Sequence, residues 1–150
     1  SGKGIMLNNM MGEDDLHSGG FHAEPPGKRV ASMMSPAALL KGDQVKLVFG
    51  TGGSKRIRTA LTQVLTQLVD FDMDLSEAVM APRMYWDGDE KIVHIEPGFS
   101  EHSMAALTER ATVNLWDDLD LYFGGVHSVI PGVAGVGDSR RGGSAIVVKL

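Results

Sequence analysis

The chain has 150 residues, 43% of them hydrophobic, which is enough apolar material for a single globular domain with a real core. Its 14 basic and 19 acidic residues give a formal charge of −5 without any long basic run, which argues against a nucleic-acid-binding surface. No run reaches the roughly 18 consecutive apolar residues of a membrane-spanning helix, and the absence of cysteine excludes disulfides and cysteine-bound metals. We expect one soluble domain over residues 1–150, and the composition leaves extracellular, periplasmic and cytoplasmic locations open.

The N-terminal part combines a short expected strand with a long polar loop. Residues 4–7 read as a strand, and the following segment contains three consecutive acids at 13–15. Loops that bind hard cations space their ligands, so consecutive acids are more typical of a solvated turn. His17 and His22 flank a loop rich in glycine, proline and serine, but no partner stands at metal-ligand spacing. We therefore expect neither a metal site nor a cofactor.

Two short apolar runs predict a β-hairpin in the next part of the chain. Residues 37–40 and 45–49 are separated by Lys-Gly-Asp-Gln, a sequence typical of a hairpin turn. We expect the two runs to pair antiparallel.

A glycine-rich turn, Gly-Thr-Gly-Gly-Ser at residues 50–54, follows the second run and precedes a predicted helix over residues 55–69. Glycines permit positive φ and leave backbone N–H groups uncovered, and Ser54 is a suitable N-cap at a positive helix end. The turn can therefore bind an anion or an oxyanion, or it can simply be a tight strand-to-helix connection. Its spacing matches neither the phosphate-binding P-loop nor the dinucleotide fingerprint, which argues against a nucleotide.

The remaining chain alternates short helices and strands, and this order predicts an α+β layered domain with a largely antiparallel sheet. The expected elements are a helix at 75–80 capped by Asp74, a strand at 92–96, a helix at 100–110 capped by Ser100, strands at 113–116 and 121–123, and a terminal hairpin of 133–136 with 145–150 around 137–143.

Six segments occur in a fixed order along nearly the whole chain. They are Gly-Ile-Met-Leu-Asn-Asn at 4–9, Pro-Gly-Lys-Arg at 26–29, Ser-Met-Met-Ser-Pro at 32–36, the glycine turn at 50–54, the stretch ending in Ala-Pro-Arg at 78–83, and Gly-Asp-Ser-Arg-Arg at 137–141. In this order and spacing the sequence resembles the γ-glutamyltranspeptidase family.

The resemblance implies an N-terminal-nucleophile hydrolase with an αββα sandwich, of which this chain would be the later part of the small subunit. In that family a precursor cleaves itself, and the new N-terminal threonine attacks a γ-glutamyl amide such as glutathione with its own α-amino group as base. The γ-glutamyl group then passes to water or to an amine. No threonine precedes Thr51 here, so the resemblance implies that the nucleophile lies upstream. We expect the piece alone to be inactive and to associate with itself or with the rest of its precursor.

Four positions correspond to the family's oxyanion hole and to its site for the substrate α-carboxylate. Gly52 and Gly53 match the paired glycines whose N–H groups form the oxyanion hole. Ser32 matches the first of two adjacent carboxylate-binding serines, whereas the second position is Met33, so one hydroxyl is lost.

Three positions correspond to the site for the substrate α-amino group. Met10 stands where the family usually has Gln or Glu, and the acid three residues on is Glu13, or Asp14 if the loop is shifted. The loss of the polar partner leaves two alternatives beside γ-glutamyl transfer, namely a related acylase that cleaves other amides and a non-catalytic module that binds anions.

The other charged candidates have structural interpretations. A charged side chain that follows Ala-Pro is more often an ion-pair partner than a site residue, so we expect this of Arg83. Asp138, Arg140 and Arg141 are expected to tie the terminal hairpin to its neighbours, and His127 is expected to be a core histidine on an apolar strand.

Overall fold

The computed structural model describes residues 2, 4, 10, 19–20 and 23–148, in two units that comprise residues 1–34 and 35–150. In the described part of the first unit, the chain turns at residues 25–28, where the Lys28 N–H donates to the Pro25 carbonyl at 3.3 Å. Lys28 also pairs with Glu24 at 2.5 Å. The strand expected at residues 4–7 lies almost entirely outside the described residues.

The described residues of the second unit form two sheets, and the larger one has four strands in the order β1-β2-β6-β7, all antiparallel. The expected hairpin is confirmed as β1 (Ala37–Lys41) and β2 (Gln44–Gly50), with an irregularity in pairing between Leu39 and Leu40. The other two strands, β6 (His127–Ile130) and β7 (Ala134–Val136), come from the end of the chain. The sheet therefore joins segments nearly 80 residues apart in sequence.

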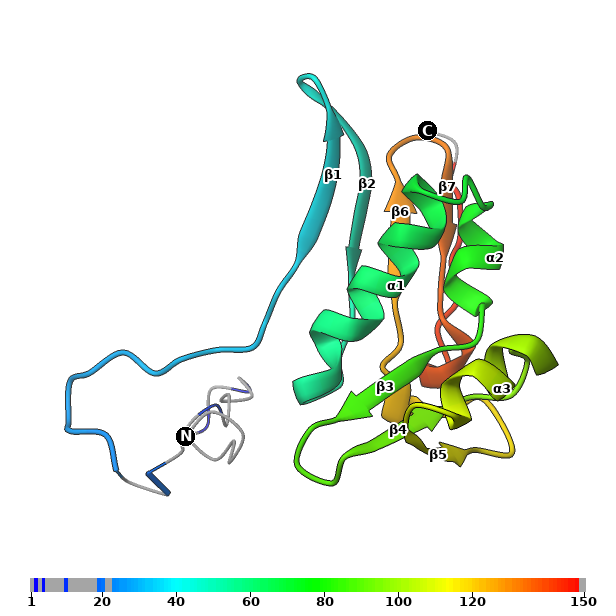
Figure 1. The fold of residues 1–150 in the computed structure, drawn as a ribbon. Helices are drawn as coiled ribbons and strands as arrows, with labels where there is room; N and C mark the ends of the chain where they lie inside the picture. Colours follow the sequence, from blue (N-terminus) through cyan, green and yellow to red (C-terminus); the bar gives the residue numbers. More distant parts are fainter. Residues whose placement is uncertain (1, 3, 5–9, 11–18, 21–22, 149–150) are drawn as a thin grey trace. The chain divides into compact units, whose positions relative to one another are not determined.

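Two helices pack against this sheet and enclose its core (Figure 1). A short 3₁₀ turn, η3 (Ser54–Arg56), leads into α1 (Ile57–Val69), and α2 (Leu75–Met80) follows. The predicted cap of α2 is confirmed, because the Asp74 carboxylate accepts a hydrogen bond from the Ser76 N–H at 2.8 Å. The buried members of the core are Leu47, Phe49, Ala60, Val64, Leu75, Ala78, Val79 and Val126.

The smaller sheet has three strands in the order β3-β4-β5. β3 (Met84–Asp87) and β4 (Ile92–Ile95) form an antiparallel hairpin, and β5 (Thr112–Leu115) joins β4 in parallel after the crossover helix α3 (Glu101–Thr108). The predicted Ser100 cap of α3 is confirmed, since its hydroxyl accepts from the Ser103 N–H at 3.1 Å. β3 was not expected from the sequence.

The end of the chain differs from the expectation in two places. The strand expected at 121–123 is a 3₁₀ turn, η4 (Leu121–Phe123), capped by Asp120. The terminal hairpin forms between β6 and β7, because a tight turn at 131–133 reverses the chain earlier, whereas 137–143 contains another 3₁₀ turn, η5 (Ser139–Arg141). Residues 144–148 form no strand. The α+β class with largely antiparallel pairing is nevertheless confirmed, and none of the helices that the structure describes has the length and apolar character needed to cross a membrane.

Candidate functional site

The glycine turn joins the end of β2 to the first turn of the helical segment, as the sequence predicts. Gly53 precedes η3 with φ of 133°, a conformation that favours glycine, and its carbonyl accepts from the Arg56 N–H at 2.9 Å. The prediction of Ser54 as N-cap was wrong. Ser54 lies inside η3 with φ of 52°, and the residue at the N-cap position is Gly53.

A second pair of glycines, Gly124 and Gly125, supports this turn from the segment before β6. The Thr51 hydroxyl accepts a hydrogen bond from the Gly125 N–H at 2.8 Å and donates to the Gly52 carbonyl at 2.7 Å. Gly124 has φ of 85°, and a Cβ there would lie 2.8 Å from the Thr51 Oγ1 atom. A residue with a Cβ atom would therefore clash with Thr51 at position 124, and only glycine fits there. Sequence reasoning missed this support, although the Gly-Gly dipeptide after Phe123 was a visible signal for a close backbone approach.

The backbone N–H groups of Gly52 and Gly53 have no hydrogen-bond partner among the residues that the structure describes. Gly52 is exposed and Gly53 is half-buried, so both lie within reach of solvent. Successive N–H groups in a turn can converge on an anion, and a developing oxyanion is such an anion. The geometry is therefore compatible with the predicted oxyanion hole.

Arg141 adds a positive charge next to these donors. A Cβ built on Gly52 would lie 3.2 Å from its guanidinium carbon, and one built on Gly125 would overlap its stem, 2.5 Å from Cγ. The two glycines thus make room for the arginine, whose guanidinium has no ion pair in the described part of the chain. Arg141 was expected to tie the terminal hairpin to its neighbours; instead, its side chain lies against the glycine turn.

Four buried charged residues form a cluster behind the turn. The Arg83 guanidinium donates to the Asp138 carboxylate at 2.7 Å, and the Arg140 guanidinium contacts both oxygens of Glu96 at 2.7 and 2.6 Å. Arg140 also pairs with Asp138 at 3.3 Å. The cluster contains two positive and two negative groups, so buried charge is balanced by buried charge. The structural interpretation of Arg83, Asp138 and Arg140 is confirmed.

The pKa values of the cluster reflect competition between burial and ion pairing. Burial raises the pKa of the Asp138 carboxyl, but the Arg83 charge and further hydrogen bonds outweigh burial and hold this pKa below its usual value. Burial lowers the pKa of Arg140, but Glu96 and Asp138 raise it above the ordinary value. For Arg83, burial and the neighbouring Arg140 charge lower the pKa.

The cluster also anchors the segment that supports the glycine turn. The Asp138 carboxylate accepts from the Val126 N–H at 2.8 Å, and Val126 directly follows Gly125. His127, the next residue, is exposed, and its Nδ1 accepts from the Asp138 N–H at 3.2 Å. The prediction of a core histidine was wrong, because the alternation of β6 buries Ser128 and turns His127 outward.

The other predicted site residues lie in the first unit. Ser32 is exposed, and its hydroxyl accepts from the Met34 N–H at 3.2 Å, whereas Met33 and Met10 are half-buried. Glu13 and Asp14 lie outside the described residues. The substrate-binding roles of these five positions stay predictions. Among the residues that the structure describes, no group of three or more histidine and acidic side chains could hold a metal ion.

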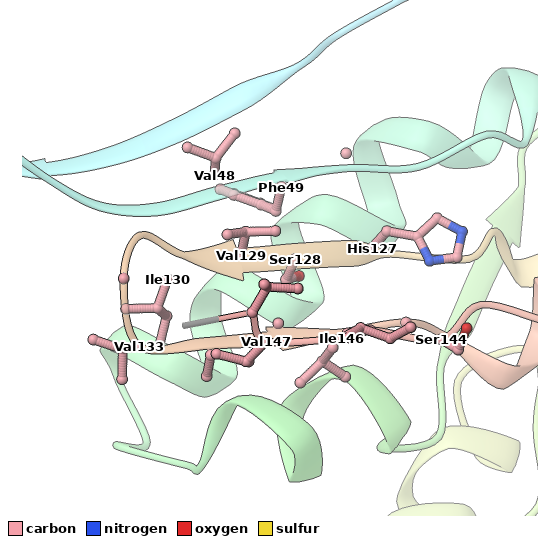
Figure 2. Close-up of a pocket in the computed structure, with 18 of the residues that line it drawn as sticks. Val48, Phe49, His127, Ser128, Val129, Ile130, Val133, Ser144, Ile146 and Val147 are labelled. Carbon is pink, nitrogen blue, oxygen red and sulfur yellow. The ribbon is translucent and has the colours of Figure 1, made fainter. Parts of the chain in front are cut away.

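The face of the larger sheet opposite the helices is apolar and exposed. Val48 pairs with Val129 across β2 and β6, and these residues are 44% and 51% exposed. A depression of about 1120 Å³ lies over these strands and β7. Figure 2 shows Val129, Ile146 and Val147 around it, with His127 at one end. Alternation in β2 explains this face, since Leu47 and Phe49 point into the core and Val48 points away.

The sequence model of the family described as gamma-glutamyltranspeptidase matches residues 1–148. The chain belongs to the γ-glutamyltranspeptidase family. It is 35% identical over 109 residues to the acylase ACY 1 proenzyme of Pseudomonas sp. strain SE83, covering 73% of this chain and 19% of that protein. It is 34% identical over 116 residues to the glutathione hydrolase proenzyme of Escherichia coli K12, covering 69% of this chain and 20% of that protein. The chain thus spans about a fifth of the length of these γ-glutamyltranspeptidase relatives.

Solved structures of the family share the fold. The γ-glutamyltranspeptidase from Pseudomonas nitroreducens complexed with L-DON superposes with a TM-score of 0.76 at 28% identity, covering 99% of this chain and 84% of that chain. The T380A mutant of the Helicobacter pylori γ-glutamyltranspeptidase gives a TM-score of 0.74 at 30% identity, with coverage of 93% and 83%. The predicted α+β fold of an N-terminal-nucleophile hydrolase is thereby confirmed.

Proposed function

We propose that this chain is the C-terminal portion of the small subunit of a γ-glutamyltranspeptidase-like enzyme. The complete enzyme cleaves γ-glutamyl amides such as glutathione and passes the γ-glutamyl group to water or an amine. Its nucleophile is an N-terminal threonine upstream of this sequence. The proposal rests on the family match over residues 1–148, together with the curated relatives, which are proenzymes.

In this proposal Gly52 and Gly53 form the oxyanion hole, and the observation that carries it is that their N–H groups have no partner among the described residues. Attack on the amide carbonyl places negative charge on its oxygen, and two fixed N–H donors stabilise that charge in the transition state. Because the turn is already formed and held by Thr51, Gly124 and Gly125, little reorganisation is required when the charge develops.

In the same proposal, the predicted substrate-binding residues recognise the α-carboxylate and α-amino groups of the substrate. Ser32 provides one hydroxyl to the carboxylate beside Met33, and Glu13 or Asp14 binds the ammonium beside Met10. Methionine offers no strong hydrogen bond, so we expect weaker γ-glutamyl binding than in relatives with polar groups at both methionine positions.

The partner of this chain is the rest of its own precursor. In the family sandwich two sheets pack face to face, and the exposed face around Val48, Val129 and Ile146 is an unpaired apolar surface of the required kind. The isolated 150-residue piece should therefore self-associate. A monodisperse monomer in sedimentation analysis would argue against this assignment of the face.

Expression of the complete reading frame tests the enzymatic proposal. Intact mass and N-terminal sequencing should show a break just before an upstream threonine, and the processed protein should hydrolyse a γ-glutamyl anilide. Gly53→Ala should abolish most of this turnover, whereas Gly50→Ala, a neighbouring substitution with open space around it, should not. A precursor that is neither cleaved nor active would contradict the proposal and favour a non-catalytic, anion-binding module.

A related acylase activity is the second candidate, favoured by 35% identity to an acylase proenzyme and by the two methionines at predicted substrate contacts. Parallel assays with γ-glutamyl and non-glutamyl amides would distinguish the two. A higher kcat/KM for an acyl amide without the α-amino and α-carboxyl groups would identify the acylase.

A further inference from the structure

We propose that Thr51 is a positioning residue that aims the N–H of Gly53 at the reacting oxygen; the catalytic part of this inference rests on the function proposed above. The Thr51 hydroxyl donates to the Gly52 carbonyl at 2.7 Å. Thr51 itself does not touch the expected position of the oxyanion. Its effect passes through one peptide group.

The carbonyl of Gly52 and the N–H of Gly53 belong to the same peptide unit. That unit is planar and trans, so its C=O and N–H point in opposite directions. A hydrogen bond that holds the carbonyl on the Thr51 side therefore holds the N–H on the other side. There it has no partner among the described residues.

The direction of this hydrogen bond is set by a second one. The Gly125 N–H donates to the Thr51 Oγ1 at 2.8 Å, so the hydroxyl serves as acceptor there. A hydroxyl has a single proton, and its acceptor in this arrangement is the Gly52 carbonyl. Gly125 in turn precedes Val126, whose N–H is bound by the buried Asp138 carboxylate. The orientation of the peptide is thus linked to the buried charge cluster.

The peptide needs such a constraint because glycine flanks it on both sides. A Gly-Gly peptide lacks the Cβ atoms that restrict rotation in other residues. Gly53 already occupies φ of 133°, and Gly124 packs 3.3 Å from the place where a Gly53 Cβ would stand. Without the hydroxyl, rotation about the φ and ψ angles beside this peptide would turn the Gly53 N–H away from the substrate.

Three variants of the complete, processed protein test this role. Thr51→Val keeps the shape of the side chain and removes both hydrogen bonds, whereas Thr51→Ser keeps the hydroxyl. Thr62→Val makes the same chemical change at an exposed threonine of α1 and serves as the control. Thermal unfolding and the extent of precursor cleavage are measured for each variant, so that loss of folded enzyme is not mistaken for loss of rate.

Thr51→Val should lower kcat for a γ-glutamyl anilide by about 10- to 100-fold, somewhat less than the 10²–10³-fold typical of deleting an oxyanion donor outright. KM should change less than about threefold, because the lost interaction is made in the transition state. Thr51→Ser should retain most of kcat and Thr62→Val all of it. Equal losses in the valine and serine variants, or an unchanged kcat in Thr51→Val, would overturn the proposal.

A crystal structure of Thr51→Val separates this inference from the proposed function, because it needs no turnover. We expect the Gly52–Gly53 peptide to be rotated or to adopt two orientations, whereas Thr51→Ser keeps the native one. A native peptide orientation in the valine variant would refute the positioning role even if the enzyme is active. A rotated peptide in a protein whose wild type is inactive would support the positioning role and contradict the proposed function.

Discussion

Two adjacent arginines, Arg140 and Arg141, enter two regions of opposite character. Every side-chain nitrogen of Arg140 donates a hydrogen bond inside the buried cluster, to Glu96, Asp138 or the carbonyls of Val79 and Ala81. Arg141 is exposed against the glycine turn, and in the described part of the chain neither its guanidinium nor the two N–H groups beside it have a partner.

The difference separates the region that holds the fold from the region that we propose for chemistry. A buried charge without partners is costly, so the cluster must be satisfied by the protein itself. Solvent-accessible donors that are held in place but unpaired are available to a ligand. The cluster and the turn are connected through Asp138, Val126 and Gly125. The buried charge cluster, whose hydrogen bonds are made within the protein, therefore supports the glycine turn.

Disruption of the buried charge cluster should have the largest effect, a loss of folding stability. Asp138→Ala would leave Arg83 and Arg140 with a single carboxylate and would remove the anchor of the Val126 N–H. We expect a loss of about 3–5 kcal/mol in the free energy of unfolding, measured by denaturant titration. The exposed Asp117→Ala is the matched control, and equal stability of the two variants would show that the cluster does not hold the fold.

Substitution in the glycine turn should lower stability less than Asp138→Ala does, and its main effect should be on activity. Gly53→Ala forces a Cβ into φ of 133° and against Gly124, at a cost of about 1–3 kcal/mol. Because the strain falls on a proposed oxyanion donor, turnover should drop by at least about tenfold. Gly50→Ala, with an unstrained backbone and open space, should retain both stability and rate. A fully active Gly53→Ala enzyme would contradict the assignment of this N–H.

Acid should weaken the cluster in a defined pH range. The folded pKa of Asp138 lies below its unfolded value of about 3.9, so its stabilising contribution is complete above about pH 5 and is lost as the pH falls through the folded pKa. Unfolding free energies measured between pH 7 and pH 2 should therefore fall mainly below about pH 4. Asp138→Asn should flatten this fall. A wild-type loss centred above pH 5 would show that another group governs acid stability.

Loss of the exposed arginine should have the smallest effect. Arg141→Ala removes a screened positive charge beside the turn, and we expect kcat/KM to fall about tenfold, or about 1.4 kcal/mol, without a change in unfolding free energy. Arg141→Lys should recover part of the loss, and Arg110→Ala, at an exposed arginine after α3, should have no effect. An effect that does not diminish at high salt would rule out this electrostatic explanation.

Local sequence signals predicted the elements whose boundaries they set directly. The turn residues between β1 and β2, the caps Asp74 and Ser100, and the glycine turn all specify their structure within a few residues. The ordered motifs predicted the family, which the match over residues 1–148 confirms.

Long-range contacts account for what the sequence did not predict. The support of Thr51 by Gly125 spans 74 residues, and the pairing of Arg140 with Glu96 spans 44, so no local pattern identifies the partner in either contact. The misplaced terminal hairpin has the same origin, since residues 144–148 have the apolar character of a strand but pair with nothing in the described part of the chain. The prediction for His127 was wrong because side chains alternate along β6, so a shift of one residue decides whether a side chain faces the core or the solvent.

The central claim, that Gly52 and Gly53 bind the oxyanion, is tested most directly by a crystal structure of the complete, processed protein with a γ-glutamyl phosphonate. This tetrahedral analogue carries an oxygen where the reacting amide would develop charge. We predict that this oxygen lies about 2.7–3.1 Å from the backbone nitrogens of both Gly52 and Gly53. An analogue bound with its oxygens away from these two nitrogens would contradict the account.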